Sequence, residues 1–216
     1  MPFQAVLFDL DGTLLDTLDD LTSSMNRALS AAGFPVHPRE AYKIFVGDGM
    51  ETLVTRALPD PARNKETVEK LFLAMRSDYS AHWADQTRAY DGVSEMLGAL
   101  EKRGLKLAVL SNKPDDFTQD VISRFFPDVP FIEVRGQKKG GPKKPDPFGA
   151  LEIARSLNLK PLDFLYLGDT STDMRTAVAA GMFPVGALWG FRSKAELLES
   201  GAKTVIEHPM ELLKLL

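Results

Sequence analysis

The chain has 216 residues, of which 26 are basic and 30 acidic, so its formal net charge is −4. This near balance gives no general attraction to nucleic acid or to an anionic membrane surface. Cysteine is absent, which excludes disulfide bonds, thiolate metal sites and cysteine nucleophiles. The sequence has no apolar run of membrane-spanning length and no signal-peptide pattern, so we expect a cytoplasmic protein that binds no membrane.

Short apolar runs bounded by turn residues recur along the chain, which is typical of buried parallel strands. Segments with helical spacing lie between the later runs and end at glycines or begin with a capping box. This alternation predicts an α/β fold, a Rossmann-like doubly wound parallel sheet. The expected strands are residues 5–8, 105–110, 131–134, 164–167, 183–187 and, with a weaker pattern, 204–206.

The interval between the first two expected strands is far longer than the roughly thirty residues of a βαβ unit. Its apolar residues keep helical spacing from Leu18 to Gly33 and from Val68 to Tyr79, with shorter helices expected around Tyr42 and Leu53. No strand pattern competes there. We therefore expect an all-helical cap domain inserted after the first strand. The expected domains are residues 16–86 for this cap and residues 1–15 with 87–216 for the core.

Two acidic residues, Asp9 and Asp11, directly follow the first expected strand. Ligands of open α/β sheets bind at the carboxyl ends of the strands, and two neighbouring carboxylates repel each other unless a cation lies between them. An ordinary Asp-Gly turn is the simpler alternative. An EF-hand loop is excluded, because Gly12 falls at the fourth position instead of the sixth and a strand precedes it.

A second acidic pair, Asp169 and Asp173, follows the strand expected at 164–167. In the simpler interpretation, Thr170 or Ser171 caps the next helix and both acids are solvated. Combined with the first pair, however, these residues supply the hard oxygen ligands that suit Mg²⁺.

Two further segments could bind an anion. Ser111 ends the second core strand, where a hydroxyl and the N–H groups of a following helix favour a phosphate, although Ser111 could equally be a helix N-cap. Lys144 is the best placed of four lysines in the loop 136–147. This loop is not a P-loop, because Pro142 stands where that motif requires lysine.

The order and spacing of these residues resemble the motifs of the haloacid dehalogenase superfamily, in its members with a helical cap after the first strand. The matching segments are Asp9-x-Asp11-Gly12-Thr13, Ser111, Lys144-Pro145, and Gly168-Asp169 through Asp173. Further similarity to the phosphoglycolate phosphatase branch of this superfamily lies in Tyr90–Val93, Ser111–Pro114 and Leu188–Phe191.

The resemblance implies a magnesium-dependent phosphatase that works through an aspartyl phosphate. Asp9 would attack phosphorus, and Asp11 would protonate the leaving group and later activate water. The implied metal ligands are Asp9, Asp11 through its backbone carbonyl, Asp169 and Asp173, the last directly or through water. The implied phosphate-binding residues are Ser111, Asn112 and Lys144.

The implied partner is a small phosphorylated metabolite, with 2-phosphoglycolate as the leading substrate and a monomer or homodimer as the acting form. In the expected cap, Gly47, Asp48 and Gly49 are predicted to face the site and select the substrate, unless they form only a turn between helices. A sugar-phosphate mutase of the β-phosphoglucomutase type or a pyrophosphatase are the alternatives among enzymes. A non-catalytic phosphate sensor is the alternative outside enzymes, and the intact Asp9 and Asp11 argue against it.

Overall fold

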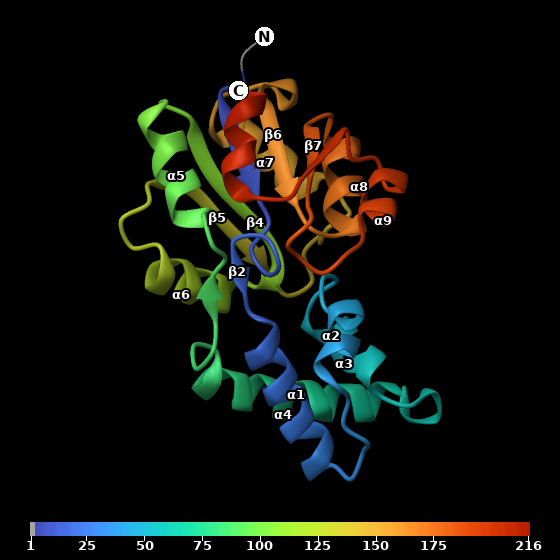
Figure 1. The fold of residues 1–216 in the computed structure, drawn as a ribbon. Coiled ribbons are helices and arrows are strands. Elements are labelled where there is room, and N and C mark those ends of the chain that lie inside the picture. Colours follow the sequence, from blue (N-terminus) through green and yellow to red (C-terminus); the bar gives the residue numbers. More distant parts are fainter. Residues whose placement is uncertain (1–2) are drawn as a thin grey trace.

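Six strands form a parallel sheet in the order β5-β4-β1-β6-β7-β8 (Figure 1). The computed structural model describes residues 3–216. This sheet, with helices on both faces, confirms the predicted α/β class. The strands are Ala5–Phe8 (β1), Lys106–Pro114 (β4), Phe131–Gln137 (β5), Phe164–Gly168 (β6), Phe183–Ala187 (β7) and Thr204–Ile206 (β8).

Strand β4 is longer than the sequence pattern predicts, because it continues past Leu110 to Pro114. After a shift in register, Pro114 pairs with Gln137 of β5. The residues that follow Leu110 are mostly polar, so the apolar pattern did not reveal this extension. Ser111 therefore lies within the strand, and helix α6 (Asp115–Phe125) begins only after Pro114.

The side chains of β1 alternate between the two faces of the sheet. Val6 and Phe8 belong to the apolar cluster of one face, and Ala5 and Leu7 belong to that of the other. All four are fully buried, which explains why this strand reads as a continuous apolar run. One face is covered by α5 (Val93–Lys102), α6 and the 3₁₀ helix η3 (Pro209–Leu215). The other is covered by α7 (Phe148–Ser156), α8 (Ser171–Ala180) and α9 (Lys194–Glu199). The 3₁₀ helix η2 (Pro161–Asp163) directly precedes β6.

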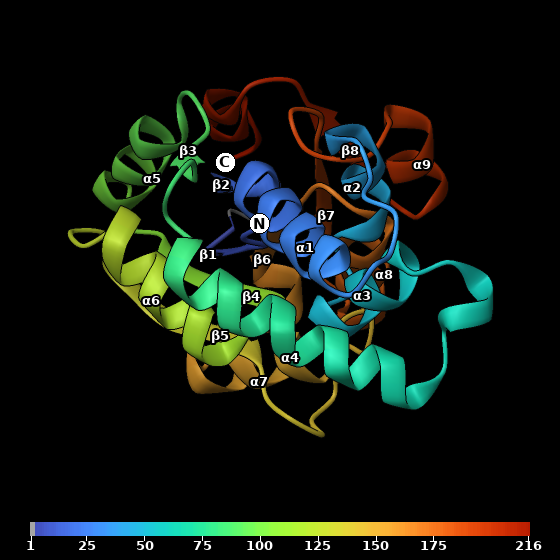
Figure 2. The same cartoon turned by 90° about the horizontal axis from the view of Figure 1, so that it is seen from below.

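A separate group of helices lies beyond the carboxyl ends of the strands (Figures 1 and 2). This helical unit has an apolar cluster of its own, to which the sheet part adds Phe117 and Phe191. Helices occur where the sequence predicts them. They are α1 (Leu18–Ala31), α2 (Arg39–Phe45), α3 (Met50–Ala57), η1 (Asp60–Ala62) and α4 (Lys65–His82). None of the helices within residues 3–216 combines the length and apolar character needed to cross a membrane.

Two short strands connect the sheet to the helical unit. β2 (Leu15–Asp16) pairs antiparallel with β3 (Arg88–Ala89). The buried carboxylate of Asp20, in α1, accepts hydrogen bonds from the backbone N–H groups of Gln86 and Thr87 and from the Thr87 hydroxyl. The outgoing and returning segments of the chain are therefore tied side by side.

Candidate active site

Strand order brings the predicted site residues to one place. β1 lies between β4 and β6, and Phe8 is in register with Val109 of β4 and Leu167 of β6. The residues that follow these positions, including Asp9 and Asp169, therefore emerge at the same edge. Along the chain, β4 and β5 are added on one side of β1 and β6 to β8 on the other. Such a reversal opens a crevice at the carboxyl ends of the strands.

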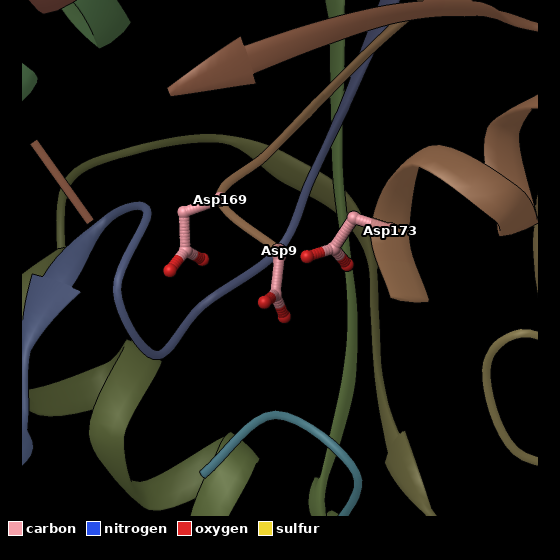
Figure 3. Close-up of side chains that lie close together, drawn as sticks. All are labelled: Asp9, Asp169 and Asp173. Atoms are coloured by element: carbon pink, nitrogen blue, oxygen red, sulfur yellow. The ribbon is translucent and has the colours of Figure 1, made fainter. Parts of the chain in front are cut away.

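Three carboxylates meet in this crevice, with Asp9 between Asp169 and Asp173 (Figure 3). One oxygen atom from each lies within 4.8 Å of the others, and all three residues are buried. Lys144 Nζ lies 2.7 Å from Asp9 Oδ1 and 2.7 Å from Asp173 Oδ1. One lysine can offset only one of three negative charges, so the cluster fits a divalent cation with hard oxygen ligands such as Mg²⁺.

The protonation of these carboxylates reflects their burial. Burial raises the pKa of Asp9 well above its ordinary value, Asp173 adds to the rise, and Lys144 opposes it. Burial, with the charge of Asp173, raises the pKa of Asp169 to about 7, although the Phe191 N–H and the Thr13 hydroxyl stabilise its ionised form. The cluster therefore resists full ionisation unless a cation is bound.

Glycines leave the space that Asp169 occupies. Gly12 has a φ of +90°, and a Cβ atom there would collide with the Asp169 carboxylate and the Phe191 ring. A Cβ atom at Gly190 would collide with the Asp169 side chain from another direction. Glycine is therefore required at position 12 both by the backbone conformation and by the close contact with Asp169.

Asp173 acts in the helix cap and in the acidic cluster together. Thr170 is the N-cap of α8, and its hydroxyl accepts from the Asp173 N–H. Asp173 Oδ2 in turn accepts from Thr170 N at 3.1 Å, while Oδ1 accepts from Lys144 Nζ at 2.7 Å. The simpler interpretation of this segment as a capped helix is correct for Thr170, and the same geometry directs Asp173 into the site.

Asp11 lies apart from the three clustered carboxylates. Its Oδ1 accepts hydrogen bonds from Thr17 Oγ1 at 2.7 Å and from Lys113 Nζ at 3.1 Å. Lys113 also donates to the Tyr79 hydroxyl, in α4, at 2.8 Å. Burial disfavours the charge of Lys113, but Asp11 and Tyr79 outweigh this effect and raise its pKa. Sequence reasoning missed Lys113 as a site residue, although it lies in Ser111–Pro114, where the resemblance had already drawn attention.

The residues predicted to bind phosphate lie next to this cluster. Ser111 Oγ accepts from Lys113 N at 3.2 Å and lines the site, so Ser111 is not a helix N-cap. The amide of Asn112 holds backbone groups: Oδ1 accepts from Lys144 N, and Nδ2 donates to the carbonyls of Lys144 and Gly47. Asn112 thereby positions the segment that carries Lys144, and phosphate binding by these residues stays a prediction.

A small cavity of about 30 Å³ lies between the sheet and the helical unit. Gly47 and Gly49 line it, whereas Asp48 is not among its lining residues. The Asp48 carboxylate instead accepts from Thr172 Oγ1 at 2.6 Å and forms an ion pair with Arg56. On the sheet side the cavity is lined by Asp9, Asp11, Ser111, Asn112, Lys113 and Pro114, and on the helical side by Leu21, Val46, Gly47, Gly49, Met50 and Leu53.

The fold and the site define an α/β enzyme with an acidic centre at the switch point of its sheet. Residues 6–187 match the family of haloacid dehalogenase-like hydrolases. The chain belongs to this family, as the resemblance predicts, and the prediction of a hydrolytic enzyme is confirmed.

Similar proteins are phosphatases by name. The chain is 31% identical to phosphoglycolate phosphatase of Mannheimia succiniciproducens, over 99% of this chain and 98% of the relative. It is 33% identical to phosphoglycolate phosphatase of Nitrosospira multiformis, over 100% and 96%. Among solved structures, a predicted phosphoglycolate phosphatase from Haemophilus somnus 129pt has a TM-score of 0.91 at 28% identity, over 99% of this chain and 97% of that one.

Proposed function

We propose that the protein is a magnesium-dependent phosphatase that hydrolyses a small phosphomonoester, with 2-phosphoglycolate as the leading substrate. The observation that carries this proposal is the position of Asp9, whose carboxylate lines the small cavity and contacts Lys144 inside the acidic cluster. A phosphate ester in the cavity would lie next to a carboxylate nucleophile. The names of the relatives support the same activity.

In the proposed mechanism, Asp9 attacks phosphorus, so that a bond from its carboxylate oxygen to phosphorus forms as the bond to the leaving oxygen breaks. Asp11 gives its proton to the leaving oxygen and then takes one from the water that hydrolyses the aspartyl phosphate. Thr17 and Lys113 hold the Asp11 carboxylate in place for both steps. Lys144 stabilises the charge on the phosphoryl oxygens, for which its contact with Asp9 places it well.

The proposed metal site consists of Asp9, Asp169 and Asp173, with the Asp11 carbonyl as a further ligand. A bound Mg²⁺ would offset the repulsion between the Asp9 carboxylate and the phosphate dianion, which is about 4 kcal/mol per charge pair at 4 Å and an effective dielectric constant near 20. The donors fit this role because they are carboxylate oxygen atoms of buried residues that lie within 4.8 Å of one another.

We propose further that residues 16–86 form a cap domain over the site. Val46, Met50 and Leu53 cover the cavity from the helical side, so closure would exclude bulk water from the aspartyl phosphate. Gly47 and Gly49 are in position to limit the size of the substrate, whereas Asp48 would act by holding their loop to the sheet part.

The test of the nucleophile is Asp9→Asn, assayed for Mg²⁺-dependent phosphate release from 2-phosphoglycolate. We expect a loss of at least about 1,000-fold in kcat, because removal of a nucleophile leaves only the other contributions to catalysis. The matched control is Asp128→Asn, which changes an exposed aspartate and should keep the wild-type rate. Appreciable turnover by Asp9→Asn would exclude the covalent mechanism.

The same assay separates the alternatives. Phosphate release from 2-phosphoglycolate without a sugar bisphosphate activator supports a phosphatase over a mutase. Faster release from pyrophosphate than from any phosphomonoester would favour the pyrophosphatase, and binding without release would favour the sensor.

A further inference from the structure

Lys113 is a buried ammonium group with unused donor capacity. Its side chain is 2% exposed, and it lines the small cavity. A lysine ammonium has three N–H donors. One is directed to Asp11 Oδ1 at 3.1 Å and one to Tyr79 Oη at 2.8 Å. Among the residues that the structure describes, no acceptor takes the third.

The charges around the cavity indicate which kind of group would accept a hydrogen bond from the third N–H of Lys113. Of the residues lining the cavity, within the described chain, Lys113 is the sole cationic one, and the wall opposite it is largely apolar. The other charged groups there, Asp9 and Asp11, would repel an anionic leaving group. Because a buried anion without a partner is strongly disfavoured, such a leaving group can be bound here only against Lys113.

The position of Lys113 limits how far this anion can be from the reacting oxygen. Its ammonium lies 3.1 Å from the carboxylate of Asp11, which in the proposed mechanism protonates the leaving oxygen. An anion bound to Lys113 is therefore only a few ångströms from that oxygen. A carboxylate on the carbon that also carries the ester oxygen is held at this spacing, whereas a carboxylate at the end of a longer chain reaches it only in folded conformations.

We propose that Lys113 binds the carboxylate of the leaving group and makes the enzyme select phosphate esters of short 2-hydroxy acids. The inference rests on the proposed function and names the substrate feature that the site recognises. Tyr79 and Asp11 fix the ammonium from two sides, so that it is in position before the substrate enters. Since Tyr79 comes from α4 and Asp11 follows β1, this position exists only when the helical unit lies against the sheet.

The experiment compares two esters that differ only in the carboxylate: 2-phosphoglycolate, and 2-hydroxyethyl phosphate, in which a neutral CH₂OH group replaces it. For wild type and Lys113→Met, kcat/KM is measured with each. We expect the preference of the wild type for 2-phosphoglycolate to fall by about 10- to 100-fold in the variant, as for loss of a hydrogen bond to a charged group. Lys113→Gln, whose amide can still donate to Asp11 and Tyr79, gives the same test if the methionine variant does not fold.

The outcomes are distinct. An equal loss of kcat/KM for both esters would overturn the inference, because Lys113 would then act only by positioning Asp11. A wild type that hydrolyses 2-hydroxyethyl phosphate at least as well as 2-phosphoglycolate would also overturn it, while the phosphatase proposal would stand. Release of phosphate from neither ester would instead overturn the proposed function.

A second measurement needs no variant. Product inhibition of the wild type should be at least about 10-fold stronger with glycolate than with ethylene glycol, in which an uncharged CH₂OH group replaces the carboxylate. Equal inhibition by the two would contradict recognition of the carboxylate.

Discussion

At the scale of single residues, the site depends on how closely the backbone approaches Asp169. The Asp169 carboxylate accepts from the Thr13 hydroxyl at 2.9 Å and from the Phe191 N–H at 2.8 Å. These contacts require the turn at Gly12 and the backbone at Gly190 to lie against the side chain, with no space for a Cβ atom. The absence of side chains at Gly12 and Gly190 therefore allows the orientation of Asp169, a candidate metal ligand.

Replacement of Gly12 by alanine should displace Asp169. We expect Gly12→Ala to lose roughly 100-fold in kcat, as for a misplacement of about 1 Å in a catalytic site, and to require more Mg²⁺ for half-maximal activity. The measurement is phosphate release over a Mg²⁺ titration.

The matched control for this variant is Gly33→Ala. Gly33 also has a positive φ, +77°, but no atom lies within 4 Å of its Cβ position. This control should show only the cost of a left-handed alanine, about 1–2 kcal/mol in stability, with catalysis unchanged. Equal loss of activity in both variants would show that backbone strain, and not contact with Asp169, is responsible.

At the scale of elements, the loop between α2 and α3 is held by the sheet part of the chain. The Arg192 guanidinium donates to the carbonyls of Ile44 and Val46 at the end of α2, where a cation is also favoured by the helix dipole. Lys143 Nζ donates to the Asp48 carbonyl at 2.9 Å. Because this loop carries Gly47 and Gly49, these contacts set the position of one wall of the cavity.

Loss of the Arg192 contacts should weaken substrate binding more than chemistry. We expect Arg192→Met to raise KM about 10-fold, from the loss of hydrogen bonds made by a charged group, with kcat changed by less than about 3-fold. Steady-state kinetics with the preferred ester measure this, and Arg175→Met, at an exposed position of α8, is the control. A fall in kcat at constant KM would contradict this role.

At the scale of the whole molecule, the acidic cluster joins parts of the chain that lie far apart in the sequence. Asp9 follows β1, Lys144 comes from the loop before α7, and Asp169 and Asp173 flank the start of α8. Repulsion between these carboxylates therefore opposes the folding of the entire sheet. Burial is the main cause of the raised pKa values of Asp9 and Asp169, and the charge of Asp173 raises both further.

These pKa values predict how stability depends on pH. The ordinary aspartate pKa is 3.8, whereas that of Asp169 in the folded protein is about 7. Between these values the folded state binds more protons than the unfolded state, so the metal-free protein should lose stability as the pH rises from about 4 to 7. Because Mg²⁺ bound as proposed would offset the ionised carboxylates, it should raise Tm by several degrees at pH 8 and by little at pH 5.

Thermal unfolding at both pH values, with and without Mg²⁺, measures this dependence. The control variant Asp169→Asn should flatten the decrease with pH and reduce the effect of Mg²⁺. A Mg²⁺ effect that is the same at pH 5 and pH 8 would show that the cation does not act on these carboxylates.

The sequence was sufficient to predict the sheet, the helices and the edge at which the site lies, because apolar periodicity reports burial and strand ends converge. It did not predict the direction of individual polar side chains. Asp48 turns to Thr172 instead of the cavity, and Lys113 meets Tyr79, 34 residues away. Such contacts depend on how the helical unit packs against the sheet part, and a local sequence pattern carries no information on that packing. Strands β2 and β3 have two residues each, so they are too short to show an alternating pattern in the sequence.

The antiparallel pair of β2 and β3 has a consequence for how such enzymes diversify. The chain leaves the sheet and returns to it at adjacent points, with Leu15 opposite Ala89 and Asp16 opposite Arg88. Everything between these points can change in length or sequence without altering the order of the six parallel strands. Evolution can therefore exchange the segment that shapes the outer wall of the cavity while Asp9 and the acidic cluster are inherited unchanged. Lys113, which lies outside that segment, would be inherited with the chemistry.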